Sequence, residues 1–334
     1  MFARVLGAIG RTMITVGVLL LLFVAYQLWG TSIRTAQAQE GLEDDFAARM
    51  EAAEAAGSIV SGPDAPATTS TTTSTTLPGA TTTTTVDRLP PTTVETLPPE
   101  LIPARGEDAG QIVIAAIGVD WTFVEGVSVA DLKKGPGHYP ETPWPGQEGN
   151  AAIAGHRTTY GQPFHNLDQL VAGDEIVVTT IQGQFTYEVR QIEIVVPTQV
   201  EVLGRAHWDF DGDPETFENS LTLTACHPKY SARERIVVAA ELVGEPAPPT
   251  PRSGDDVRED DPVAFEDDLS GDRSGAGPAV AWGAICAGIW IIAWAIGRIR
   301  PRAKWPAYFV GIVPFLVCLF LFFENFSRLL PANY

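Results

Sequence analysis

Basic residues and cysteines are scarce in this chain, and each shortage excludes a class of protein. Lys and Arg account for only 22 of 334 residues against 41 Asp and Glu, so the formal net charge is −19. A general nucleic-acid binder needs a basic face, which this balance does not supply. The three cysteines and five histidines show no CxxC pair and no zinc-ligand spacing. Neither a nucleic-acid partner nor a structural zinc site is indicated.

Charged residues are nearly absent from three apolar stretches, residues 12–30, 279–297 and 306–324. Each has about the length that spans a bilayer. Residues 298–305, between the last two stretches, are basic. Because short cytoplasmic loops carry an excess of basic residues, we predict a multi-pass protein of the cell membrane. The predicted cytoplasmic parts are residues 1–11 and 298–305, and the predicted outer parts are residues 31–278 and the tail of residues 325–334.

A cleaved signal peptide is the alternative for the first apolar stretch, since Ala36-Gln37-Ala38 resembles a signal-peptidase site. The stretch is longer than a usual signal core of roughly 7–15 residues, and Arg34 interrupts the approach to the site. An uncleaved anchor is therefore favoured. The alternative for the last two stretches is a buried helical hairpin of a soluble protein, which the basic residues between them disfavour.

Segments of biased composition divide the outer part. Residues 31–61 include an Ala/Glu-rich segment that could continue the anchor as a polar helix. Residues 62–107 are mostly a Thr/Pro-rich tract, which cannot bury a core. Fully extended, the tract would reach on the order of 130 Å, so we expect a spacer that lifts the next domain off the bilayer. Residues 245–278 form a second, acidic linker, which charge repulsion should keep open.

One domain of ordinary size is predicted between these linkers, over residues 108–244. It contains runs rich in β-branched residues with turn signals between them, and no alternation of strands with helices. The predicted fold is all-β, a closed or nearly closed barrel with short helices over residues 129–133 and 164–170. The predicted strands are residues 111–119, 150–154, 175–180, 185–196, 221–224 and 235–242.

Cys226 is the one cysteine in this foldable part, because Cys286 and Cys318 lie in the apolar stretches. A lone thiol in an exported domain is a liability unless its reactivity is used. Cys226 ends a strand-like run and precedes His227-Pro228, so it should lie at a rim that a substrate can reach. Free Cys has a pKa of about 8.5, so attack on a carbonyl near neutral pH needs a base and a positive charge nearby.

His156 and Arg235 are the candidates for that help. His156 follows the strand-like residues 150–154 across Gly155, so it too lies at a strand end. Arg235 opens the last predicted strand, a hairpin-like distance after the cysteine, and could hydrogen-bond an oxyanion or a substrate carbonyl. Arg233 is the rival for this role, because strand alternation would place both arginines on one face.

These segments resemble the sortase family of cysteine transpeptidases. TLTACHP, residues 222–228, is similar to the TLxTC motif, and GNAAIAGHRTTYGQPFHNLDQL, residues 149–170, resembles the catalytic-His segment. PGHYPETPWPG, residues 136–146, looks like the preceding loop of class E sortases of actinobacteria. The resemblance covers about residues 110–243, with the His, Cys and Arg segments in family order. One departure is Ala225, where the family usually has Thr; we expect it to change the wall of the cleft slightly.

The resemblance implies a two-step reaction at Cys226, His156 and Arg235. The thiolate would attack the Thr–Gly amide of an LAxTG- or LPxTG-like sorting signal on a surface protein, with His156 as general acid/base and Arg235 as oxyanion donor. A lipid-linked peptidoglycan precursor would supply the amine that resolves the thioacyl enzyme. No cofactor or metal is implied. The residues expected to line the substrate groove are Thr222, Thr224 and Arg233.

The other polar clusters have plainer interpretations. His138, His165, His207 and His227 are expected to be structural or solvated. His227 neighbours the thiol, but adjacent strand residues point to opposite faces. The acidic residues between positions 209 and 218 lack the Gly and the terminal Glu of a calcium loop, so a solvated loop is expected there.

Three other functions stay open. A pilin-polymerising sortase would use a Lys side chain as the acceptor, and the sequence does not specify the acceptor. A hydrolytic cysteine protease would release peptide without an added amine. A non-enzymatic, stalked surface scaffold would explain the Thr/Pro-rich tract but not the lone exported thiol with its His and Arg segments.

Overall fold

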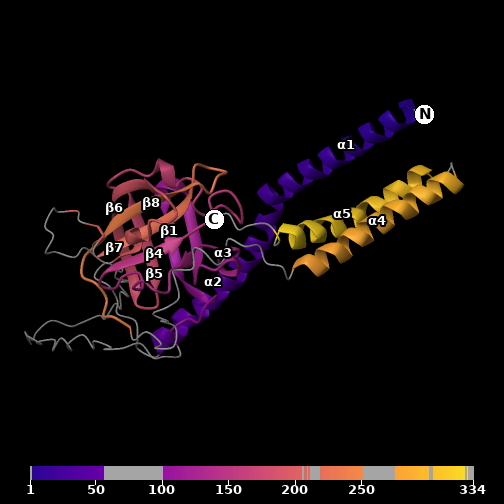
Figure 1. Cartoon of the computed structure of the whole chain (residues 1–334). Helices are drawn as coiled ribbons and strands as arrows, with labels where there is room; N and C mark the ends of the chain where they lie inside the picture. The colour runs from indigo at the N-terminus through magenta and orange to yellow at the C-terminus, as the bar shows by residue number, and fades with distance from the viewer. Residues whose placement is uncertain are drawn as a thin grey trace, which may run out of the picture.

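The computed structural model describes residues 2–55, 101–204, 207, 208, 210, 219–250, 275–300, 304–327 and 329. Figure 1 shows a barrel of strands, a long N-terminal helix that reaches it, and a pair of C-terminal helices.

The barrel is closed and has the strand order β1-β2-β3-β4-β7-β8-β6-β5. The β2–β3 and β4–β7 pairs are parallel, and the other pairs are antiparallel. The predicted all-β closed barrel is confirmed. Its strands are β1 (Asp108–Ile114), β2 (Val119–Glu125), β3 (Gly137–His138), β4 (Asn150–Ala154), β5 (Glu175–Thr180), β6 (Gly183–Val195), β7 (Ser220–His227) and β8 (Glu234–Val243).

Alternation along the strands fills the barrel with apolar side chains. Ile112, Ile153, Leu223 and Val238 are fully buried members of one core cluster that draws on most strands. Residues at odd spacing from these point outward, so each strand has a core face and an outer face. The outer face of β7 carries the side chain of Cys226, because Leu223 and Ala225 belong to the core.

One predicted strand is wrong. Residues 111–119 form two strands, because β1 ends at Ile114 and β2 begins at Val119. A short 3-10 turn, Ala115–Ile117, connects them, and Gly118 follows with φ of 69°, a left-handed conformation that glycine adopts at little cost. The predicted helix over residues 129–133 is found as α3 (Val129–Leu132), and residues 164–170 contain a 3-10 turn, Leu167–Gln169.

The N-terminal helix runs without a break from the predicted first span into the outer part of the chain. It consists of α1 (Phe2–Ala25), a π-helical turn η1 (Tyr26–Gly30) and α2 (Thr31–Ala55). Figure 1 shows α2 lying along the barrel. The buried residues of α2 recur on one face, at Thr31, Thr35, Gln39, Leu42, Phe46 and Ala53.

The docking of α2 bears on the spacer predicted for the Thr/Pro-rich tract, most of which lies outside the described residues. Leu101, where the described chain resumes, packs with Met50 against a cluster of Phe46, Ala53 and Ile181. The described chain therefore resumes beside the C-terminal end of α2. The barrel rests on α2 itself. The spacer expected of the tract falls outside the described residues and stays a prediction.

The C-terminal helices α4 (Ala276–Ile299) and α5 (Lys304–Ser327) form a hairpin. Three helical stretches of the described chain are long and apolar enough to cross a membrane: Gly10–Ala55, Ala276–Ile299 and Tyr308–Ser327. The Tyr26 ring of η1 meets Phe320 of α5 at 5.2 Å between ring centroids. Arg34 Nη2 lies 2.7 Å from Glu324 Oε2. The C-terminal end of the predicted first span and the start of α2 thus contact the C-terminal end of α5.

Candidate active site

Three neighbouring strands gather the predicted residues at one rim of the barrel. In the barrel order, β7 lies between β4 and β8. β4 and β7 run parallel with Ala154 opposite Thr224, and His156 and Cys226 each follow two residues later, so both lie at the same end of this pair. On the other side, Arg235 of β8 is the direct cross-strand partner of Cys226. Side chains of such partners lie within contact distance.

The two candidate arginines have different surroundings. Arg235 is buried, and its Nη1 donates to the carbonyl oxygens of Ala232 and Glu234, at 3.1 Å each. Arg233 is exposed and precedes the first residue of β8. Strand alternation therefore does not extend to Arg233, and the structure puts only Arg235 opposite the thiol.

The His156 side chain is almost completely buried, with 4% exposed. The β4–β7 ladder continues past the strand end through the Gly155 N–H, which donates to Thr224 O at 3.0 Å. The Thr159 hydroxyl lies 3.3 Å from Nδ1 of His156, and the Tyr160 ring lies 4.8 Å from its ring between centroids. Burial lowers the pKa of His156 to about 3, and the positive charge of Lys133 adds to the decrease. The imidazole is therefore neutral and can accept a proton.

The Cys226 thiol is also buried, with 7% exposed. Burial raises the pKa of the thiol above its ordinary value, and the positive charges of Arg235 and Arg157 oppose this effect. The thiol and the imidazole are thus both neutral at neutral pH. The transfer of one proton between them would give a thiolate and an imidazolium, with Arg235 placed beside the developing negative charge.

Arg157 is a neighbour of the thiol that the sequence did not single out. Its side chain is fully buried, and Nη1 donates to Cys226 O at 3.1 Å and lies 3.0 Å from Nδ1 of His227. Nη2 forms an ion pair with Asp168 at 2.8 Å. The only sequence signal was its position directly after the candidate base. Arg157 ties the loop after β4 to the end of β7.

Tyr139 was also missed, although it stands in the loop that resembles class E sortases. Its hydroxyl lies 3.1 Å from the Thr224 hydroxyl, and burial raises its pKa to about 12. The charges of Arg235 and Cys226 act on this pKa as well, which places Tyr139 beside the site. Thr224 thus borders the site. Thr222 has no exposed surface; its hydroxyl accepts from Trp208 Nε1 and donates to Asn150 Oδ1.

We had expected Ala225 to lie in the wall of the cleft, and this prediction is wrong. It belongs to the barrel core, because its side chain points to the opposite face from that of Cys226. Substitution there acts on core packing instead.

The remaining histidines have structural partners. His138 is fully buried, with Nδ1 2.7 Å from Glu125 Oε2 and Nε2 2.9 Å from Pro143 O. The His165 Nδ1 donates to Arg157 O at 2.8 Å. His207 meets the Trp208 ring edge-on.

No group of three His, Cys, Asp or Glu side chains that could hold a metal occurs among the described residues. The acidic loop over positions 209–218 lies almost entirely outside those residues, so its calcium and solvated-loop interpretations are left as predictions.

Known proteins resemble this chain in the same region. Residues 112–243, which contain β4, β7 and β8, match the family model "Sortase domain". Sortase SrtE1 of Streptomyces coelicolor is 30% identical over 71% of this chain and 57% of its own length. Sortase D of Bacillus subtilis is 30% identical over 38% of this chain and 58% of its own length. The chain thus spans less than two thirds of these two relatives.

Among solved structures, sortase E from Streptomyces avermitilis is 37% identical over 42% of this chain and 91% of that chain, with a TM-score of 0.38. The name of the Streptomyces coelicolor relative agrees with the class E resemblance of residues 136–146. Through the domain that carries Cys226, His156 and Arg235, the chain belongs to the sortase family.

Proposed function

We propose that this chain is a membrane-anchored cysteine transpeptidase that cleaves the Thr–Gly bond of an LAxTG- or LPxTG-like sorting signal. It would then join the carried surface protein to an amine of a lipid-linked peptidoglycan precursor. The observation that carries the proposal is the placement of three residues at one end of neighbouring strands: Cys226 in β7, His156 two residues after β4, and Arg235 in β8. The names of the related sortases support the same chemistry.

In the first step, Cys226 gives its proton to His156 and the sulfur attacks the threonine carbonyl carbon. Arg235 stabilises the oxyanion of the tetrahedral intermediate, because it lies directly across the ladder from the thiol. The C–N bond then breaks, and His156 returns the proton to the leaving glycine amine. The product of this step is a thioester between Cys226 and the threonine.

In the second step, the acceptor amine attacks the thioester carbonyl and passes a proton to the neutral His156. The C–S bond breaks as the new amide forms, and His156 returns the proton to the leaving thiolate. No bond to water is made, so the two steps exchange one amide for another. Burial leaves the imidazole unprotonated at the start of each step. A general base works best with a pKa near the operating pH, so this cycle requires the pKa of His156 to rise when the site opens to substrate.

The proposed setting is the outer face of the cell membrane, with residues 1–11 and 298–305 in the cytoplasm. The contact between η1 and the C-terminal end of α5 puts these two ends on one side of the membrane, and the basic residues of 298–305 favour the outer side for both. Cysteines introduced at Glu245 and at Ala303, in a chain without other cysteines, test the orientation in whole cells. An impermeant maleimide should label the first and not the second; the reverse pattern would contradict this orientation.

Turnover of fluorogenic LAxTG and LPxTG peptides by the full chain in detergent tests the chemistry. We expect near-total loss of turnover in Cys226→Ala, His156→Ala and Arg235→Ala. Arg233→Ala is the matched control, because that side chain is exposed and lies outside β8; we expect a modest loss there. Turnover retained by Cys226→Ala would refute the proposed nucleophile.

The products decide between the remaining reactions. With triglycine present, a transpeptidase should yield a peptide joined to triglycine, and a hydrolase should yield the free acid at the same rate with or without it. A scaffold should give no cleavage at all. Transfer to a lysine-bearing pilin peptide in preference to the precursor amine would favour pilin polymerisation instead.

A further inference from the structure

Helix α2 holds the barrel through polar side chains spaced four residues apart. The Thr35 hydroxyl donates to Lys133 O at 2.9 Å. Gln39 Nε2 donates to Thr122 O and to Lys134 O, at 2.9 Å each, while Gln39 Oε1 accepts from the Thr122 N–H at 3.0 Å. These side chains are buried, so the hydrogen bonds form away from solvent. The helix is thereby fixed to the backbone of β2 at Thr122 and to the residues after α3 at Lys133 and Lys134.

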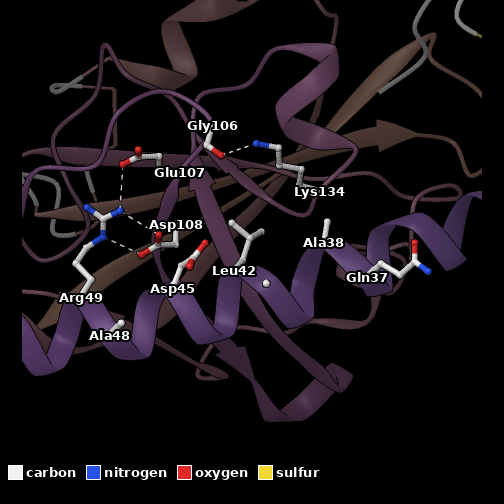
Figure 2. A pocket seen from close by; sticks show the side chains of 11 residues that line it. Gln37, Ala38, Leu42, Asp45, Ala48, Arg49, Gly106, Glu107, Asp108 and Lys134 are labelled. Carbon is white, nitrogen blue, oxygen red and sulfur yellow. Dashed lines mark hydrogen bonds and ion pairs between the residues drawn. The ribbon is translucent and has the colours of Figure 1, made fainter.

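The far end of α2 is fixed by charge. Arg49 donates through Nε and Nη2 to the two carboxylate oxygens of Asp108, at 2.9 and 3.0 Å, and Nη2 also reaches Glu107 at 3.1 Å. Figure 2 shows these contacts beside a cavity of about 600 Å³ between α2 and the barrel. A bidentate pair of this kind fixes geometry as well as adding attraction. The helix and the barrel therefore form one unit along most of α2.

The near end of α2 reaches the loop that carries His156. Thr31 is the first residue of α2, and its buried hydroxyl donates to Gln27 O at 2.9 Å and accepts from the Tyr160 N–H at 3.1 Å. The Tyr160 ring in turn packs on the His156 ring, and Lys133 Nζ lies 5.8 Å from the centroid of the Tyr160 ring. One helix thus holds both Tyr160, through Thr31, and Lys133, through Thr35.

The backbone at Tyr160 needs such support. Tyr160, Gly161 and Gln162 have φ values of 51°, 76° and 57°, so three successive residues are left-handed. A tyrosine in this region is strained, and strained residues persist only where their surroundings fix them. The hydrogen bond from Thr31 and the ring contact with His156 are two such constraints.

We propose that the membrane anchor supplies part of the active site: Thr31 and Tyr160 are positioning residues that hold a cap over His156 and limit access to it. The proposal rests on the assignment of His156 as the catalytic base. The contact lies one residue after the predicted first span, so the cap sits near the membrane surface. A substrate must displace Tyr160 to reach the imidazole.

Chemical labelling of His156 in the full chain tests the cap directly. Diethyl pyrocarbonate modifies exposed neutral imidazoles, and mass spectrometry reads each histidine separately. Thr31→Val removes the hydroxyl at nearly constant volume, and loss of this hydrogen bond should raise the labelling rate of His156 roughly fivefold. Thr31→Ser keeps the hydroxyl and should behave as wild type. His138, which is fully buried, is the internal control and should stay unlabelled in every variant.

Peptide turnover supplies an independent readout. If the cap must open before substrate binds, Thr31→Val should lower KM by a factor similar to the labelling increase and leave kcat unchanged. Tyr160→Ala removes the ring and should raise the labelling of His156 even where Thr31→Val folds poorly.

Labelling of His156 at the wild-type rate in both Thr31→Val and Tyr160→Ala would overturn the cap, whatever the turnover. Absence of peptide turnover in the wild type, with faster labelling in the variants, would refute the proposed function and leave the cap standing.

Discussion

Arg157 makes polar contacts on several sides although its side chain is fully buried. It donates to Cys226 O and forms an ion pair with Asp168, and its Nε lies 3.4 Å from His165 O. Arg157→Met keeps most of the volume and removes the donors and the charge. Each buried carbonyl left without a donor costs about 1–3 kcal/mol, so the thermal midpoint of the full chain should fall.

The same substitution should change the chemistry at Cys226. Loss of the positive charge should raise the pKa of the thiol further, because Arg157 opposes the effect of burial. The pH profile of Cys226 alkylation should then shift to higher pH, and Arg157→Lys should restore part of the shift. Arg190→Met is the control, since Arg190 pairs with Glu188 and Glu241 on the surface. An alkylation profile in Arg157→Met that matches the control would contradict this role.

His156 should make the stability of the chain depend on pH. Its pKa is about 3 in the folded state and about 6.5 in the unfolded state, so the unfolded state binds the proton more tightly. The contribution of the neutral imidazole is complete above pH 6.5 and is lost as the pH falls toward 3, with a limiting slope of about 1.4 kcal/mol per pH unit. The thermal midpoint of wild type should therefore fall more steeply between pH 7 and pH 5 than that of His156→Gln. Parallel curves would contradict the burial of His156.

The side chain of Gln39 makes three hydrogen bonds from α2 to the backbone of the barrel domain. Gln39→Leu leaves the Thr122 N–H and two carbonyl oxygens without their partner in a buried place. We expect a loss of about 1–3 kcal/mol and earlier proteolytic cleavage of α2. Gln37→Leu on the exposed side of the same helix is the control and should change neither. Equal protease resistance in the two variants would show that the contact between α2 and the barrel contributes little to stability.

Strand content and the reactive end of β7 were predictable because both are local properties of the sequence. Period-two burial marks β5, whereas β7 and β8 are buried along nearly their whole length and are marked by their apolar runs. The motif around Cys226 marks the end of β7. The boundary between β1 and β2 was missed because Ala115–Ile117 is as apolar as the strands beside it, and only Gly118 indicates the turn. Arg157 and Tyr139 were missed because their partners come from distant segments.

The docking of α2 was not predictable for a different reason. Its contacts near the active site come from Thr31, Thr35 and Gln39, which are polar side chains with no apolar periodicity. A polar stripe in sequence looks like a solvated face, and only the hydrogen bonds to the barrel backbone distinguish it. The Thr/Pro-rich tract nearby suggested a stalk, so composition favoured a domain held away from the membrane.

At the scale of the whole molecule, α1, η1, α2 and the barrel form a continuous connection that does not include the Thr/Pro-rich tract. Deletion of residues 66–95 leaves about 15 residues to join Ala55 to Leu101, enough for a span of up to roughly 50 Å. Because Leu101 packs near Met50 of α2, the ends are already close, and the shortened chain should keep its fold. We expect an unchanged thermal midpoint and unchanged peptide turnover.

The control for this deletion is Ala47→Pro, which breaks α2 in the middle of its contact with the barrel, since proline in a helix interior costs about 3 kcal/mol. This variant should lower the thermal midpoint and expose α2 to protease while it leaves the tract intact. If the deletion impaired turnover and Ala47→Pro did not, the tract would be the element that positions the domain. The opposite outcome assigns that task to α2, which places the catalytic rim beside the bilayer, where lipid-linked acceptors are held.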